Sequence, residues 1–207
     1  MEQNHVRADI CRVLASLISK PDEELIEVIN SGAAYRALIA GLHDPEIDTE
    51  FLRDADYTLD SLTELYNASM TPAGRTVLLP VESVFKPWTN DDESHPAMRG
   101  RKGLLMGDPA LHMLELYRRS GYEIPDEFNG QPDHLALLLE FLSVLYESYS
   151  DTMVCQFMQD HLDWMPDLIT RCRELEIAPF YHSVFRLVDA FINKERSLFE
   201  RCYEVKV

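Results

Sequence analysis

Apolar residues recur along most of the chain at the three- and four-residue spacing that is typical of amphipathic helices. Ile10, Leu14 and Ile18 lie on one face of the first predicted helix, and Pro21 prevents its continuation. Apolar and polar residues alternate only over 76–79, a stretch too short to build a sheet. The pattern therefore predicts an all-α protein, with further helices over 21–31, 33–42, 49–69, 108–120, 132–149, 152–162, 166–175 and 179–203.

The segment 71–103 interrupts this helical pattern. It contains four prolines and a polar run, and at about 33 residues it is longer than the connections that compact domains ordinarily use. We therefore predict a single helical-bundle domain over 1–207, in which this connector joins N-terminal helices at 1–70 to a C-terminal bundle at 104–207. We also expect the connector to be a mobile part of a binding site, because loops that bind partners are drawn from the less stable parts of a fold.

The predicted helix 132–149 is the most apolar of the chain, and such a helix belongs in the middle of a bundle. Its polar strip consists of Asp133, Glu140 and Glu147, which are spaced by one heptad and so stay on nearly one face. Asp133 and His134 at its start have two open interpretations. They are either a helix cap beside an imidazole that bonds a local carbonyl, or an acid–base or binding pair.

The chain is strongly acidic, with 19 basic and 36 acidic residues and a formal net charge of −17. Nucleic acids and anionic membranes are held mainly by Lys and Arg, so binding to either is disfavoured and a cationic partner is favoured. The longest apolar run, 135–146, is too short to cross a bilayer, and residues 1–9 lack the pattern of a secretory signal. The cysteines are dispersed, at Cys11, Cys155, Cys172 and Cys202. They fit reduced core residues, so we predict a cytoplasmic protein.

Catalytic signatures such as a Gly-rich phosphate loop, a nucleophile elbow or a His-Glu-x-x-His motif do not occur in the sequence. The nearest imitations of metal-ligand spacing are His112 with Glu115 and Asp133 with His134, which we interpret as a surface pair and a helix start. His161 falls where a helix should end, and we interpret it as terminal packing. We therefore predict no metal site and no enzyme. One basic cluster is either a solvated loop or an anion-binding site, and it consists of Arg99, Arg101 and Lys102.

Four short motifs stand in order along the chain. They are Leu-Pro-Val-Glu-Ser-Val-Phe at 79–85, Met-Gly-Asp-Pro at 106–109, Pro-Asp-His-Leu at 132–135, and Phe157 to Trp164 followed by Pro-Phe-Tyr at 179–181. Together they resemble the TorD-type chaperones, also called redox enzyme maturation proteins, over residues 8–200. The chain departs from that pattern at Gln131 and Leu138, where the family often has glutamate. Glu140 cannot replace the second glutamate, because two helical residues turn a side chain by about 200°.

The resemblance implies a cytoplasmic helical chaperone that binds the twin-arginine signal peptide and the apo-form of a molybdoenzyme catalytic subunit before cofactor insertion and export. It implies no required cofactor, with transient binding of the molybdopterin cofactor or a nucleotide left open, and a monomer or a helix-swapped dimer. Carboxylates beside an apolar groove would suit such a peptide, because guanidinium groups pair with planar carboxylates. The residues predicted to bind the client are Glu82, Ser83, Phe85, Trp88, Asp133, His134 and Glu140. The two aromatic residues are expected to be exposed anchors in the connector.

Two other functional classes stay open from the sequence. A helical metal-dependent enzyme would use Asp133, His134 and His161, and metal analysis of the pure protein would reveal it. An acidic helical scaffold would bind basic proteins generally, whereas a maturation chaperone would select one twin-arginine leader.

Overall fold

The computed structural model describes residues 2–42, 48–71, 77–91, 93 and 99–204, and residues 2 and 200–204 by their backbone only. Within these ranges the chain forms helices joined by loops, and extended residues pair only at two isolated bridges, Val81 with His134 and Thr89 with Arg99. The prediction of an all-α protein is therefore confirmed. The α-helices are α1 Glu2–Ile18, α2 Glu23–Asn30, α3 Ala33–Leu42, α4 Leu59–Met70, α5 Glu82–Phe85, α6 Asp108–Ser120, α7 Leu135–Ser148, α8 Asp151–His161, α9 Met165–Glu174 and α10 Pro179–Glu204. Short 3-10 turns, η1 Glu50–Leu52 and η2 Asp126–Phe128, lie in the connections.

Several helix ends follow from local signals in the sequence. The Asp22 side chain caps α2 by accepting a hydrogen bond from the backbone N–H of Leu25 at 2.8 Å. Pro109 stands in the first turn of α6, where its missing N–H is harmless. Gly121 ends the same helix in the left-handed conformation with φ of 69°, which an L side chain rarely adopts.

The helix predicted over 49–69 is two elements in the structure. After η1 the chain passes through Asp54, which has a positive φ of 53°, and α4 begins only after Thr58. The side chain of Asn30 fixes the extended segment between them, because it accepts a hydrogen bond from the Tyr57 N–H at 2.9 Å and donates to the Tyr57 carbonyl at 2.7 Å. Thr58 and Ser61 then form a capping box that starts α4. A contact between residues far apart in sequence therefore overrides the apolar period.

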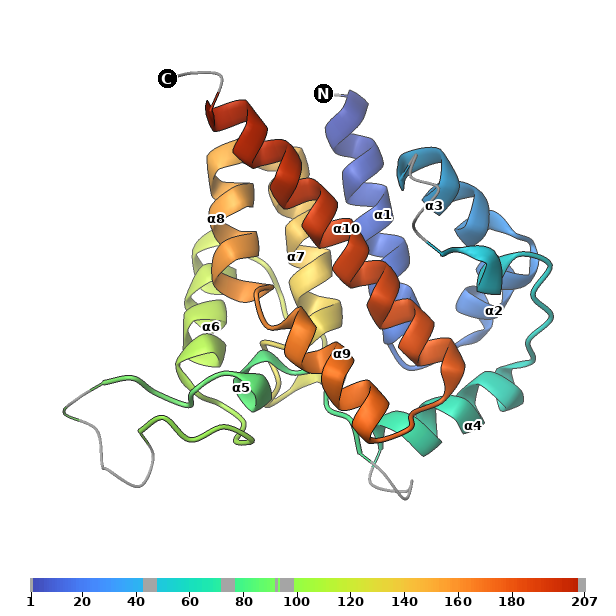
Figure 1. The fold of residues 1–207 in the computed structure, drawn as a ribbon, viewed down its shortest axis with the longest axis horizontal. Coiled ribbons are helices and arrows are strands. Elements are labelled where there is room, and N and C mark those ends of the chain that lie inside the picture. The colour runs from blue at the N-terminus through green and yellow to red at the C-terminus, as the bar shows by residue number, and fades with distance from the viewer. Residues whose placement is uncertain (1, 43–47, 72–76, 92, 94–98, 205–207) are drawn as a thin grey trace.

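The core is built around α7, whose first five residues are all fully buried. Its largest helix–helix interface is with α1, and α8 also packs on it (Figure 1). The long helix α10 contacts α1, α4, α8 and α9. The sequence predicted that a connector joins the N-terminal helices to a C-terminal bundle, and in the structure α1 packs against α7 of that bundle. The first helix of the chain is an integral part of the bundle.

The carboxylates that the sequence placed on an acidic strip of α7 are paired with other side chains. The Tyr122 hydroxyl donates to Glu140 at 2.5 Å, and Glu147 pairs with Arg12 of α1 at 2.5 Å. Asp133 is not helical at all, because α7 begins at Leu135, two residues after it. The strip expected from the heptad spacing is therefore not one open acidic surface.

The connector 71–103 contains the helical turn α5 and contacts the ends of several helices (Figure 1). Its residues 72–76, 92 and 94–98 lie outside the described residues, so the expectation of a mobile connector stays a prediction for them.

Among the described residues, no single helix is long and apolar enough to cross a membrane. The helices α2 and α3, which meet at a bend of 64°, reach that length and composition only together. Cys11 and Cys172 are buried thiols, Cys155 is half-buried, and the side chain of Cys202 lies outside the described part.

Candidate functional site

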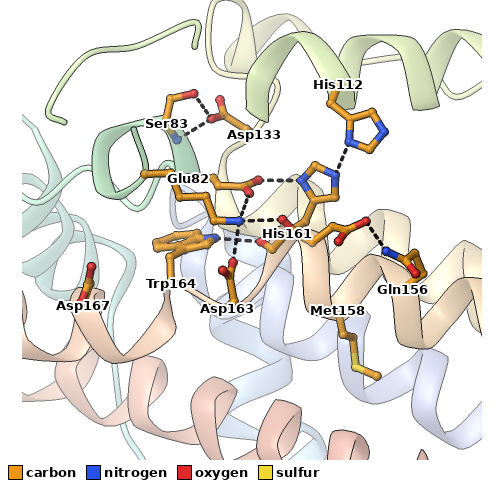
Figure 2. Close-up of polar contacts among 12 residues, drawn as sticks. Glu82, Ser83, His112, Asp133, Gln156, Met158, His161, Asp163, Trp164 and Asp167 are labelled. Carbon is orange, nitrogen blue, oxygen red and sulfur yellow. Dashed lines mark hydrogen bonds and ion pairs between the residues drawn. The ribbon is translucent and has the colours of Figure 1, made fainter. Parts of the chain in front are cut away.

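The helical turn α5 is fixed against the start of α7 by backbone hydrogen bonds. The N–H of Leu135 donates to the Pro80 carbonyl at 2.8 Å, and the N–H of Glu82 donates to the Asp133 carbonyl at 3.0 Å. Two of the motifs that carry the family resemblance, 79–85 and 132–135, thus lie directly against each other. Figure 2 shows Ser83 of the first motif turned toward Asp133 of the second.

Asp133 accepts two hydrogen bonds from Ser83, one from its backbone N–H at 2.7 Å and one from its hydroxyl (Figure 2). The Ser83 oxygen in turn accepts from the N–H of Gly107 at 3.3 Å, just before α6. Burial raises the pKa of Asp133, and the two hydrogen bonds from Ser83 oppose this rise. The Asp133 carboxylate therefore joins α5, α6 and α7 inside the protein.

The cap of α7 is His134, and not Asp133 as one interpretation of the sequence had it. The imidazole Nδ1 accepts a hydrogen bond from the backbone N–H of Ala136 at 3.2 Å. Its ring packs against Phe128 with ring centroids 4.9 Å apart. Burial lowers the pKa of His134 to about 4, so the imidazole is neutral at pH 7 and can act as this acceptor.

Glu82 is fully buried and belongs to a chain of polar groups that leads outward. Its Oε2 lies 2.8 Å from Nδ1 of His161, and Nε2 of His161 lies 2.8 Å from Nδ1 of His112 (Figure 2). Lys86 Nζ lies 2.9 Å from Glu82 Oε1 and 2.5 Å from the carboxylate of Asp163. Burial by itself would lower the pKa of Lys86, but the two carboxylates outweigh it and raise that pKa. A buried carboxylate is thus paired on one side with an ammonium and on the other with an imidazole.

Phe85 and Trp88 are not the exposed anchors that we expected. The Phe85 side chain is only 8% exposed and stacks on Trp164, with ring centroids 5.0 Å apart and planes at 18°. Trp88 is half-buried, and its indole N–H donates to the carbonyl of Leu105 at 3.0 Å. Both rings hold the connector against the helices, because aromatic side chains gain more from burial than from exposure in a loop.

A groove of about 410 Å³ runs beside this network, between α6, α7 and α8. Its floor is formed by the buried side chains of Phe141 and Leu145. Its wall includes Met153 and Tyr149, which are 47% and 36% exposed although they are apolar or aromatic. The remaining lining residues are His112, Leu116, Arg119, Ser120, Gln156, Phe157, Asp160 and His161.

The two ends of this groove differ in chemistry. α6 and α8 are placed so that His112, near the start of α6, meets His161 at the end of α8, and Asp160 lines the groove beside them. Met153 and Tyr149 belong to the opposite end of α8 and the end of α7. The groove therefore has an imidazole and carboxylate end, and a second end where exposed apolar side chains lie with Arg119 and Ser120 from the end of α6. An arrangement of this kind can bind an apolar segment that carries a positive charge at one end.

The residues predicted from sequence are only partly brought together. Glu82, Ser83, Asp133 and His134 cluster around α5, but all four are buried, with exposures of 0 to 6%. Glu140 instead lines a separate groove of about 550 Å³ beside α1 and α2. In the basic cluster, Lys102 pairs with Asp167 at 3.2 Å, and Arg101 is exposed. The roles of these residues in binding a client or an anion stay predictions.

Sequence reasoning missed the partners of Glu82. Lys86 stands four residues after it, a spacing that brings side chains together on a helix and could have indicated the pair. His112 and His161 were each noted alone, and no local pattern connects α6 to the end of α8. Glu115, which with His112 only imitated the spacing of metal ligands, is bound by Arg118 and Arg119. In the part of the chain that the structure describes, no group of three His, Cys, Asp or Glu residues is arranged to hold a metal ion.

These features define a single-domain helical protein with a groove beside a buried polar network. The family model described as nitrate reductase delta subunit matches residues 31–170, more than half of the chain, and the chain belongs to this family. It is 26% identical over 226 residues to chaperone protein TorD of Vibrio cholerae serotype O1, an alignment that covers 97% of this chain and 95% of the relative. It is 22% identical to chaperone protein TorD of Shewanella piezotolerans, with 93% and 91% covered.

A solved structure from Archaeoglobus fulgidus, described as a redox enzyme maturation protein, shares the fold. It aligns with a TM-score of 0.53 and 22% identity over 94% of this chain and 93% of that chain. The resemblance to TorD-type chaperones is therefore confirmed by the family and by these relatives. The chain is a maturation chaperone, and the prediction that it is not an enzyme agrees with the names of its relatives.

Proposed function

We propose that this chaperone acts in the cytoplasm on the catalytic subunit of a molybdoenzyme, and that it binds the twin-arginine signal peptide of the apo-enzyme before cofactor insertion and export. The observation that carries the proposal is the groove between α6 and α8, which is apolar along its floor and ends at Asp160 and His112. A twin-arginine leader has the matching chemistry, because its arginines precede an apolar stretch.

In this proposal the apolar stretch lies over Phe141, Leu145 and Met153, and the arginines lie at the Asp160 end. Burying the exposed surface of Met153 and Tyr149 supplies the apolar part of the affinity. The net charge of −17 speeds the encounter with a cationic leader. The molybdopterin cofactor is a group destined for the client and not a resident group of this chain.

The buried residues of the motifs have a positioning role here. Glu82, Ser83 and Asp133 hold α5 against α6, α7 and the end of α8, and these three helices form the groove. A change at one of them would deform the groove without removing a direct contact to the leader. This explains how residues that are 0% exposed can matter for a binding function.

Titration calorimetry with a synthetic twin-arginine leader tests the proposal. Met153→Asp places a charge in the apolar half of the groove, and we expect it to weaken leader binding about tenfold or more, because a charge would be buried against apolar residues. Leu111→Asp is the matched control, since Leu111 is 54% exposed on α6 but does not line the groove.

The proposed site is wrong if both variants weaken binding equally or if neither does. A second peptide, with the same arginines but a polar stretch in place of the apolar one, separates this function from a general acidic scaffold. A scaffold would bind both peptides alike. The chaperone should prefer the apolar leader.

A further inference from the structure

His112 occupies a special place in the groove between α6 and α8. Its Nδ1 lies 2.8 Å from His161 Nε2, and the two rings stack with centroids 4.8 Å apart. The other ring nitrogen, Nε2, points away from His161 (Figure 2). His161 is 2% exposed, whereas His112 is exposed to solvent at the groove. The buried polar network therefore reaches the groove through this one imidazole.

The hydrogen bonds along the chain determine which nitrogen of His112 carries a proton. Lys86 Nζ lies 2.9 Å from Glu82 Oε1, and this pairing keeps a carboxylate facing His161. A carboxylate can only accept, so Nδ1 of His161 donates to Glu82, and in the neutral ring of His161 Nε2 is then the acceptor. Nδ1 of His112 must then donate to His161. The remaining nitrogen, Nε2 of His112, carries a lone pair and presents an acceptor to the groove.

We infer that His112 is the acceptor in the groove for a guanidinium N–H of the bound leader, and that Glu82 and His161 are positioning residues that hold it in the accepting tautomer. This inference rests on the proposed function, since it names how the same groove selects an arginine. Asp160 supplies the negative charge beside the acceptor. A guanidinium has several N–H donors, so it can bond to an imidazole acceptor and to a neighbouring carboxylate together.

The charges that face His112 come from three elements. His161 and Asp160 belong to α8, Glu82 to α5, and Arg119 to α6 itself. Burial and the guanidinium of Arg119 lower the pKa of His112, as would a positive charge on His161, against the opposing effect of the two carboxylates. The accepting form of His112 therefore predominates at pH 7.

Protonation of His112 at Nε2 converts this nitrogen from a hydrogen-bond acceptor into a donor. If Nε2 takes up a proton, the ring becomes a cation whose Nε2–H can only donate, and it repels a guanidinium. Leader affinity should therefore fall as the pH is lowered through the titration of this imidazole. A variant that lacks His112 still contains Asp160, so a fall in leader affinity that disappears in that variant is due to His112 and not to Asp160.

Nitrogen NMR of the histidine side chains tests the tautomer without any peptide. At pH 7.5 we expect the His112 signals of a ring protonated at Nδ1 and bare at Nε2. A ring protonated at Nε2 overturns the inference, whether or not a leader binds. This measurement is independent of the proposed function.

A double-mutant cycle then tests the contact. Calorimetry would compare the wild type and His112→Leu, each with a twin-arginine leader and with a leader whose arginines are replaced by norleucine. Loss of a hydrogen bond to a charged group predicts that His112→Leu weakens binding of the arginine leader about tenfold and leaves the norleucine leader nearly unaffected. His5→Leu is the control, because His5 is an exposed histidine on α1 outside the groove.

The pH profile gives the third readout. Wild type and His5→Leu should both bind the arginine leader more weakly at pH 5.5 than at pH 7.5, and His112→Leu should lose this difference. Equal losses for both leaders, or an unchanged pH profile in His112→Leu, overturn the inference while leaving the groove intact as a leader site. Absence of leader binding in the wild type overturns the proposed function, and with it this contact.

Discussion

The buried cap of α7 makes the protein sensitive to mild acid in a way that one substitution should remove. His134 is 6% exposed, accepts a hydrogen bond from the N–H of Ala136, and packs on Phe128. Burial lowers the pKa of His134 to about 4, because the imidazolium would lose its hydration there. In the unfolded chain the same imidazole titrates near its usual pKa of about 6.5.

The sign follows from comparing the two states. Between pH 6.5 and pH 4 the unfolded chain binds a proton at His134 and the native protein does not, so the free energy of unfolding falls as the pH drops. The stabilisation is present above pH 6.5 and is lost progressively toward pH 4. For this pair of pKa values the loss between pH 7 and pH 5 is about 2 kcal/mol, and it approaches about 3 kcal/mol below pH 4.

His134→Asn is the appropriate change, because asparagine is a good helix cap and does not titrate. The variant should be less stable than the wild type at pH 7, since it loses the packing on Phe128. Its further loss between pH 7 and pH 5 should be smaller than that of the wild type by about 2 kcal/mol. Asp133 and the other titrating groups are present in both proteins, so their contributions cancel in this comparison.

Urea unfolding, followed by the fluorescence of the two tryptophans, gives the free energies at both pH values by linear extrapolation. His5→Asn serves as the control, because His5 is an exposed histidine and its removal should leave the pH dependence unchanged. The reasoning is refuted if His134→Asn loses as much stability between pH 7 and pH 5 as the wild type does.

Two further substitutions test how α5 and α6 are joined. Ser83→Ala removes the hydroxyl that donates to the buried Asp133, and we expect a loss of about 1–3 kcal/mol in urea unfolding, against less than about 0.5 kcal/mol for the exposed Ser16→Ala; equal losses would contradict this. Gly107→Ala would place a Cβ 2.6 Å from the backbone oxygen of Trp88, so the melting temperature should fall by an amount that corresponds to about 2 kcal/mol or more. An unchanged melting temperature would contradict this, because it would mean that the backbone at Trp88 moves away from the added Cβ at no cost in stability.

Much of the fold was predictable because its signals are local. The bounds of α3 and the left-handed Gly121 that ends α6 follow from residues within a few positions of each helix end. The break before α4 was not predictable, since the side chain of Asn30 creates it from 27 residues away. Helix ends that depend on neighbouring residues were predicted, and the break that depends on a residue distant in the sequence was not.

The candidate site shows this distinction more strongly. The motif at 79–85 and the Asp-His pair indicated the right region, but their contacts join residues 50 and 79 positions apart. Asp133 was expected at a helix end and instead binds Ser83, because a buried carboxylate needs donors that the local sequence does not supply. The meeting of His112 with His161 depends on how two helices pack, which neither residue signals alone.

The packing of α1 against α7 determines when the core can close during synthesis. About 120 residues separate the end of α1 at Ile18 from the start of α7 at Leu135, which corresponds to roughly 6–24 s of elongation. Throughout that interval the apolar face of α1 lacks the helix that covers most of it in the native protein. During its own synthesis this maturation chaperone thus passes through a stage in which the apolar face of its first helix is exposed and prone to aggregation. Ribosome-bound chains that end before Leu135 should therefore be more easily cleaved by protease within α1 than chains that include α7.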